Sequence, residues 1–140
     1  MSLCILDASF TFQWLFEDEA TPEGDAALGA IRLGGAMVPA LWPFEIANVL
    51  GIAERRGRLT RDGMSDALAL LRPLPLQIVD PLTLAETETV LDLMRRHRLT
   101  GYDATYLELA VRLQLPLATK DHDLLVAAPA AGVAVFAVAP

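Results

Sequence analysis

Cysteine is almost absent from this sequence of 140 residues, because Cys4 is the only one. One thiol cannot form a disulfide within the chain, and it cannot build the zinc sites that need several thiolates. Cys4 stands among apolar residues, so we expect its thiol to be buried and chemically inert. Any metal site in this chain must therefore use ligands other than a cysteine cluster.

Positive charge is also scarce. The sequence has 11 lysine and arginine residues against 18 aspartates and glutamates, which gives a formal net charge of −7. This is the wrong sign for a protein that holds nucleic acid through bulk electrostatics. A polyanionic partner would need a local basic patch, or cations bound by the protein.

The sequence lacks a basic leader and a long hydrophobic run. Asp7 interrupts the apolar residues at the amino terminus, where a signal peptide would continue. The longest uncharged stretch, residues 124–140, is broken by Pro129 and Gly132 and is too short for a membrane span. With 54% hydrophobic residues and no charged low-complexity tract, we expect a cytoplasmic globular protein, folded as one domain over residues 1–140.

Short apolar runs alternate with longer amphipathic runs, which predicts an α/β fold with a mainly parallel sheet. The predicted strands are residues 3–6, 36–38, 76–79, 117–119 and 133–138. The predicted helices are residues 8–16, 22–33 and 43–56, a helix from Thr60 that ends before Pro73, and residues 83–97, 103–113 and 121–127.

Four acidic residues stand where these elements meet. Asp7 and Asp121 follow strands, and Glu45 and Asp103 lie at the starts of helices. The carboxyl ends of parallel strands share one edge of a sheet, and ligands bind outside that edge. We therefore expect the four acids to meet in one crevice.

Each acid alone also has an ordinary structural explanation. Asp7 and Asp121 are suited to cap helices. Glu45 would be favoured by a helix dipole, and Asp103 completes a capping-box pattern with Thr100. It is the occurrence of all four at such junctions that favours a shared site.

A cluster of this kind would need cations. Two carboxylates about 5 Å apart repel by about 3 kcal/mol at an effective dielectric constant of about 20. Oxygen ligands select hard ions such as Mg²⁺ or Mn²⁺ over zinc. These ions suit phosphoryl chemistry, because they lower the pKa of an attacking water and neutralise charge on a phosphate.

Four sequence blocks around these acids resemble, in order, the motifs of PIN domains, and in particular those of VapC toxins from bacterial toxin–antitoxin pairs. The blocks are residues 5–9, 43–50, 102–107 and 117–121, and the resemblance spans residues 3–138. It implies a three-layer α/β/α sandwich with a mainly parallel central sheet of about five short strands.

The resemblance also implies a set of site residues. The catalytic and metal-binding acids of the family match Asp7, Glu45, Asp103 and Asp121. Supporting positions, which match hydroxyls, a polar neighbour and a further acid beside the metal, are Ser9, Thr119, Asn48 and Asp123.

The implied activity is that of a Mg²⁺- or Mn²⁺-dependent endoribonuclease. Glu45 would bind a metal or orient the attacking water, and cleavage would displace a 3′-oxygen and leave a 5′-phosphate. The family further implies a homodimer that a VapB antitoxin holds inactive, with the antitoxin tail in the acidic groove. Arg55, Arg56 and Arg58 would contact RNA phosphates, unless they are only solvated helix ends.

Two other functions stay open from the sequence. A receiver-like signalling domain also gathers acids, a threonine and a lysine at strand ends, and Thr119-Lys120 fits that pattern, although no acidic pair follows the first strand. A PIN fold without activity would serve as a partner-binding scaffold, but all four acids are present. Among the aromatic residues, Phe44 is predicted to lie in the core or a dimer interface, and Tyr106 fits either the core or the site.

Overall fold

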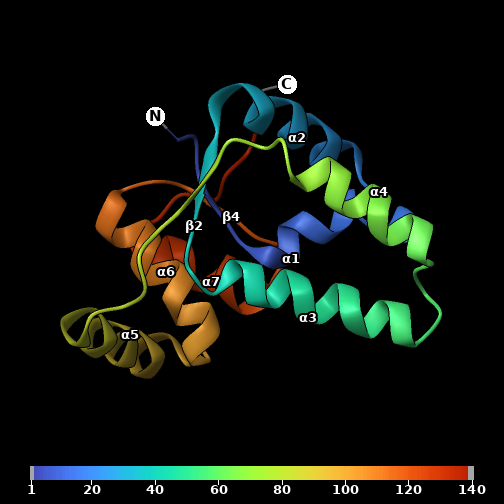
Figure 1. The fold of residues 1–140 in the computed structure, drawn as a ribbon. Coiled ribbons are helices and arrows are strands. Elements are labelled where there is room, and N and C mark those ends of the chain that lie inside the picture. The colour runs from blue at the N-terminus through green and yellow to red at the C-terminus, as the bar shows by residue number, and fades with distance from the viewer. Residues whose placement is uncertain (1, 139–140) are drawn as a thin grey trace.

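The computed structural model describes residues 2–138, so residue 1 and residues 139–140 of the predicted domain lie outside the described part. Within residues 2–138 the central sheet has four parallel strands in the order β3-β2-β1-β4. Their bounds are β1 Ile5–Leu6, β2 Ala36–Val38, β3 Leu76–Ile78 and β4 Leu117–Ala118. The predicted α/β fold with a parallel sheet is confirmed (Figure 1).

The predicted fifth strand, residues 133–138, is reduced to a single bridge. Val135 pairs in parallel with Leu117. The Leu117 amide donates to the Ala134 carbonyl, and the Phe136 amide donates to the Leu117 carbonyl, both at 2.9 Å. Of the two β4 residues, Leu117 forms this bridge, and no continuous ladder follows from it in the described residues. The described sheet therefore has fewer strands than the five that were predicted.

Helices connect the strands. Their bounds are α1 Ala8–Thr11, α2 Pro22–Gly34, α3 Trp42–Arg55, α4 Arg61–Leu71, α5 Leu84–His97, α6 Gly101–Leu113 and α7 His122–Ala130, with 3₁₀ turns η1 Phe12–Trp14 and η2 Glu17–Glu19. Four helices follow a threonine whose hydroxyl oxygen accepts an amide three residues later, and these are Thr21, Thr60, Thr83 and Thr100. Local capping thus fixes where these helices begin.

Three of the predicted helices differ from the structure by more than one residue at a boundary. The helix predicted over residues 8–16 divides into α1 and η1. Helix α6 begins two residues before Asp103, because Thr100 is its N-cap and Asp103 occupies the third helical position. Helix α7 continues past residue 127 to Ala130.

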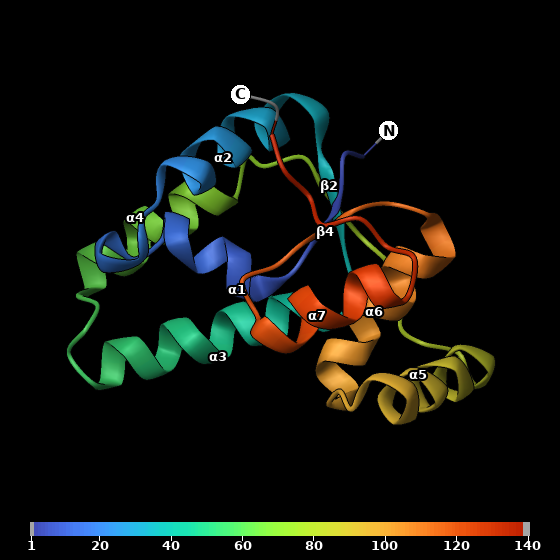
Figure 2. The same cartoon turned by 180° about the vertical axis from the view of Figure 1, so that it is seen from behind.

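The sheet lies between two groups of helices. In Figures 1 and 2, α2 and α4 lie on one side of the strands, and α5 and α6 lie on the other. Ile5, Leu6 and Leu107 are fully buried between these layers. Cys4 is also fully buried, and burial raises the pKa of its thiol to about 12, which confirms the expected inert thiol.

Helices α3 and α4 form a hairpin that extends away from the strands (Figure 1). Arg58, in the turn after α3, binds η2 by ion pairs with Asp18 at 3.0 Å and with Glu19 at 2.8 Å. Its guanidinium also lies 3.8 Å from the ring centroid of Phe16. The hairpin turn is thereby attached to the segment that precedes α2.

Within residues 2–138, none of the helices combines the length and the apolar character that crossing a membrane would require.

Candidate metal centre

Asp7 is held at the carboxyl edge of the sheet by strand pairing. In the β1–β4 register, Leu6 lies opposite Ala118, so the next residues, Asp7 and Thr119, leave the sheet side by side. The Asp7 amide donates to the Ala118 carbonyl at 2.9 Å. As a result the Asp7 side chain is only 3% exposed.

Two hydroxyl groups donate to the same oxygen of Asp7. Ser9 Oγ lies 2.6 Å and Thr119 Oγ1 lies 2.7 Å from Oδ2. The backbone amides of Lys120 and Asp121 donate to these hydroxyl oxygens, each at 3.0 Å, so the hydroxyl protons are turned toward Asp7. Neither hydroxyl uses the other carboxylate oxygen, Oδ1.

These contacts argue against a capping role for Asp7. It precedes α1, but its side chain caps no amide of that helix. Burial raises the pKa of Asp7, the hydrogen bonds from Ser9 and Thr119 oppose that increase, and the negative charge of Asp121 adds to it. A buried carboxylate beside another negative charge is stabilised by taking up a proton or by binding a cation.

Glu45 enters from the first turn of α3. The Tyr106 hydroxyl donates to Glu45 Oε1 at 2.6 Å. Burial raises the pKa of Glu45, the hydrogen bond from Tyr106 lowers it, and the charges of Asp7 and Asp103 raise it again. The α3 acid is therefore within electrostatic reach of the acids on β1 and α6.

Asp103, Asp121 and Asp123 form the other half of the site. Each offers a carboxylate oxygen, and these oxygens all lie within 4.8 Å of one another. The pKa of Asp103 rises to about 6, chiefly through burial and then through the charges of Asp121 and Asp7. Asp121 also caps α7, because its Oδ2 accepts the Leu124 amide at 2.9 Å. For Asp121, the capping explanation and the shared-site explanation are compatible.

The residues present fit a hard divalent cation. The donors in this cluster are carboxylate and hydroxyl oxygens, which Mg²⁺ and Mn²⁺ prefer. The charges of neighbouring acids help to raise the pKa values of Asp7, Glu45 and Asp103, so a bound cation would relieve a repulsion that the folded chain creates. Asp7, Asp103, Asp121 and Glu45 are the residues that would hold it, with Asp123 beside them.

Asn48 is exposed on α3 about one turn beyond Glu45, on the same side of the helix. The predicted arginines lie farther from this centre. Arg55 follows Glu45 by ten residues on the same helix, about 15 Å along its axis, and Arg56 follows next. Arg58 is engaged with η2. The structure therefore brings together the acids and the two hydroxyls, and it does not bring these arginines to them.

Tyr106 was not assigned to the site from the sequence. It lies three residues after Asp103 on α6, a spacing that puts two side chains on the same face of a helix. That spacing was a usable signal. Its partner Glu45 is 61 residues away, so the contact itself follows only from the fold.

The strand order excludes the receiver-like alternative. Receiver domains have the order 2-1-3-4-5, whereas this sheet has the order β3-β2-β1-β4.

Solved structures share this fold at low sequence identity. PAE2754 from Pyrobaculum aerophilum matches with a TM-score of 0.69 and 23% identity, covering 90% of this chain and 84% of that chain. FitAcB from Neisseria gonorrhoeae matches with a TM-score of 0.66 and 20% identity, covering 95% and 96%. A toxin–antitoxin complex from Klebsiella pneumoniae matches with a TM-score of 0.61 and 17% identity, covering 96% and 99%.

Among curated proteins, none is a significant match to the chain. The PIN domain family, in contrast, matches residues 4–129, a range that includes all of the acids described above. The chain belongs to the PIN-domain family.

Proposed function

We propose that this protein is a Mg²⁺- or Mn²⁺-dependent endoribonuclease and the toxin of a VapBC-like toxin–antitoxin pair. PIN domains are generally metal-dependent nucleases. The observation that carries the proposal is the convergence of acids from β1, α3, α6 and the start of α7, with Asp7 almost fully buried. A catalytically silent scaffold would have no use for this costly set of charges.

The chain's own residues suggest a division of roles. Asp7, Asp103 and Asp121 would hold the cation, with Ser9 and Thr119 fixing Asp7 through its Oδ2. Glu45 would hold a cation or orient the attacking water. A divalent cation, when bound, lowers the pKa of water and neutralises charge on the scissile phosphate. The net charge of −7 then ceases to exclude RNA, because the cation supplies the local positive charge.

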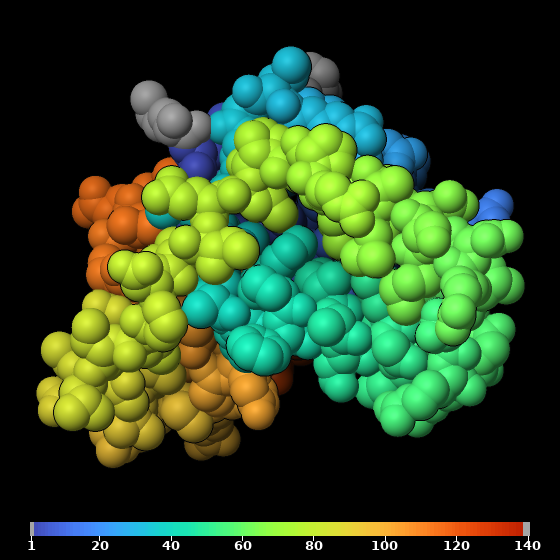
Figure 3. Space-filling model, in the orientation of Figure 1, coloured from blue at the N-terminus to red at the C-terminus, as the bar shows by residue number. Residues whose placement is uncertain are grey.

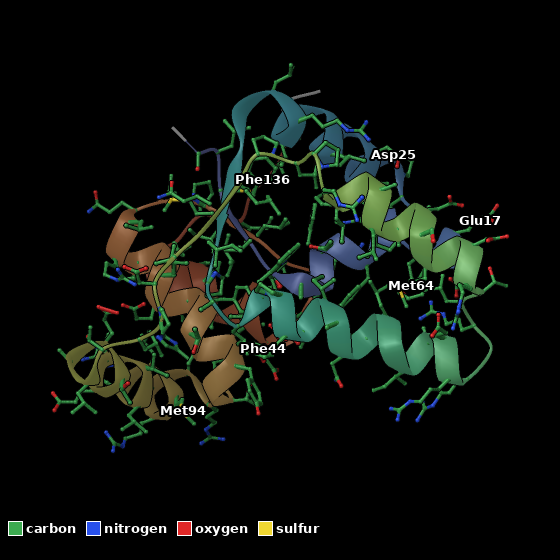
Figure 4. The ribbon with its side chains drawn as sticks, viewed as in Figure 1. Glu17, Asp25, Phe44, Met64, Met94 and Phe136 are labelled. Carbon is green, nitrogen blue, oxygen red and sulfur yellow. The ribbon has the colours of Figure 1, made fainter. Side chains whose placement is uncertain are left out.

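A groove between α3 and α4 suits an antitoxin. Its volume is about 560 Å³, and its walls are mainly apolar, with Ile46, Leu50 and Met64 among them. Figure 4 shows Met64 on α4 between the two helices. The apolar face of an amphipathic helix fits a groove of this chemistry. One similar structure is described as a toxin–antitoxin complex, which supports a protein partner of this kind.

One wall of the groove is the helix that carries Glu45. Trp42, which lines it, is three residues before Glu45 on α3. A basic tail that follows a helix bound in the groove would be attracted to the acidic centre. Such a tail would compete with the cation and the RNA phosphate, which explains how an antitoxin would silence the enzyme.

A second apolar surface suits another copy of the chain. A cavity of about 720 Å³ lies between the start of α3, α5 and α6. Its walls include Phe44, which is 74% exposed, and Leu91, which is 43% exposed. Figure 3 shows atoms of α6 (orange) between α5 and the start of α3, and Figure 4 shows Phe44 and Met94 on the two flanking helices. Exposed apolar surfaces of this kind mark interaction sites, and we assign this one to the predicted homodimer.

Cleavage of single-stranded RNA by the purified chain tests the proposed activity. We expect cleavage with Mg²⁺ or Mn²⁺, loss of cleavage in EDTA, and at least about a 100-fold slower rate for Asp7→Asn, because that change removes a buried ligand charge. Product ends would carry a 5′-phosphate. We also propose that the protein acts in the cytoplasm of the cell that expresses it.

The matched control is Asp25→Asn, which alters an exposed acid on α2 (Figure 4). It should cleave at the wild-type rate, and circular dichroism should show that both variants are folded. Cleavage that EDTA leaves unchanged would refute metal dependence. An unchanged rate for Asp7→Asn would remove Asp7 from the site.

A further inference from the structure

One buried hydroxyl connects the two helices that deliver acids to the centre. Tyr106 on α6 is fully buried, yet its hydroxyl reaches Glu45 on α3. The distance between the Tyr106 hydroxyl and Glu45 Oε1 is 2.6 Å, in the short range typical of a hydroxyl that donates to a carboxylate. Asp103 lies three residues before Tyr106, on the same face of α6.

This hydrogen bond removes a freedom that glutamate otherwise keeps. The terminal torsion of a glutamate side chain is soft, so its carboxylate rotates easily. The Tyr106 hydroxyl donates to Oε1 of Glu45, so Oε2 stays available as a metal ligand. The hydrogen bond also restricts the rotation of the carboxylate and so fixes where Oε2 lies. Because the Tyr106 side chain is fully buried, its hydroxyl group cannot move away from Glu45.

A side chain that only filled the core would not need the hydroxyl. The ring of Tyr106 is fully buried, and phenylalanine would fill the same space equally. The hydroxyl instead ends at one of the acids that approach Asp7 and Asp103. Its position therefore indicates a task at the acidic centre.

We propose that Tyr106 is a positioning residue, which holds the Glu45 carboxylate in the orientation that a divalent cation requires. This inference rests on the proposed metal-dependent function. Removal of a residue that orients a metal ligand without touching the metal typically weakens metal binding by about 10–100-fold. Tyr106 would therefore affect metal binding through Glu45, the carboxylate to which its hydroxyl donates.

The test measures Mn²⁺ affinity by isothermal titration calorimetry on the full chain without RNA. Tyr106→Phe removes one oxygen and keeps the ring. We expect it to bind Mn²⁺ about 10-fold more weakly than the wild type, and to cleave RNA correspondingly more slowly. Tyr102→Phe is the matched control, because it removes the hydroxyl of a tyrosine on the same helix that is 65% exposed. It should bind Mn²⁺ like the wild type.

A second pair of variants separates positioning from packing. In a Glu45→Ala background, Tyr106→Phe should change Mn²⁺ affinity by less than about twofold, because the residue through which it acts is gone. An equal loss in both backgrounds would mean that Tyr106 only supports the fold, and it would overturn the proposal. Unchanged Mn²⁺ affinity of Tyr106→Phe would overturn it as well.

The outcomes are distinguishable from a failure of the proposed function. A wild-type chain that binds no Mn²⁺ would refute the metal centre itself, whereas a wild type that binds and a Tyr106→Phe that binds equally would refute only the inference. If circular dichroism shows that Tyr106→Phe is unfolded, the double variant replaces it, because removing both partners of a hydrogen bond is far less disruptive than removing one. The double variant and Glu45→Ala should then bind Mn²⁺ equally, and a weaker double variant would contradict the proposal.

Discussion

At the scale of single residues, the raised pKa of Asp103 makes the free energy of unfolding depend on pH. Its pKa is about 6 in the folded protein against an ordinary value of 3.8. The folded state therefore binds this proton more tightly than the unfolded state between those two pH values. The free energy of unfolding therefore decreases as the pH rises through this window. Above about pH 6, without metal, the ionised Asp103 carboxylate destabilises the folded state by its full amount.

Asp103→Asn should therefore raise the thermal stability of the metal-free protein at pH 7.5. Because the carboxylate is partly exposed and screened, we expect a gain of about 1 kcal/mol, or about 2–4 °C in Tm. The gain should shrink as the pH falls from 6 and disappear below the ordinary pKa of 3.8, where the wild-type carboxyl group is protonated in both states. Thermal melts in EDTA across this pH range measure the effect.

The control for this prediction is Asp66→Asn, which changes an exposed acid on α4. It should not reproduce the pH-dependent gain. Added Mg²⁺ should stabilise the wild type more than Asp103→Asn. A large loss of stability in Asp103→Asn at pH 7.5 would favour a capping role at the start of α6 over a role in a repulsive cluster.

At the scale of elements, most helix starts were predictable because their signals are local, although α6 begins at Gly101, two residues before the predicted start. Thr83 and Glu86 form the capping box that their spacing predicted. The fifth strand was not predictable, since its pairing depends on contacts with β4 rather than on local signals. Asp7 and Thr119 were expected at one edge, but only the β1–β4 register decides that the Thr119 hydroxyl reaches the same Oδ2 that Ser9, two residues from Asp7, contacts locally.

The attachment of the α3–α4 hairpin gives a prediction at the same scale. Arg58→Ala removes the ion pairs with Asp18 and Glu19 and the contact with Phe16. Since the charged groups are exposed to solvent, we expect only a small loss of stability, at most a slight decrease in the urea midpoint. Urea denaturation at low salt and at about 1 M salt should show that salt reduces the difference between variant and wild type.

Arg55→Ala is the matched control, because Arg55 is an exposed arginine at the end of α3. It should leave stability unchanged. If Arg58→Ala slows RNA cleavage at unchanged stability, the original prediction of a phosphate contact would regain support. An Arg58→Ala protein with wild-type stability at every salt concentration would show that the attachment to η2 has no energetic effect.

At the scale of the whole molecule, the exposed apolar surface beside the acids predicts self-association. Leu91→Glu places a charge on α5 within that surface and should convert a dimer into a folded monomer, because an unpaired buried charge is costly at an interface. Light scattering coupled to size-exclusion chromatography measures the mass. Leu33→Glu is the control, since Leu33 on α2 is 93% exposed and lies outside this surface. A Leu91→Glu protein that remains dimeric would place the interface elsewhere.

The hydrogen bond between Asp7 and Thr119 spans 112 residues of the chain. During translation, Asp7 is synthesised long before Thr119. Strand β1 can pair with β4 only after β4 has left the ribosome. A growing or prematurely terminated polypeptide therefore carries Asp7 without the neighbour that fixes it. Under the proposed function, the unfinished chain would not yet cleave the messenger that encodes it.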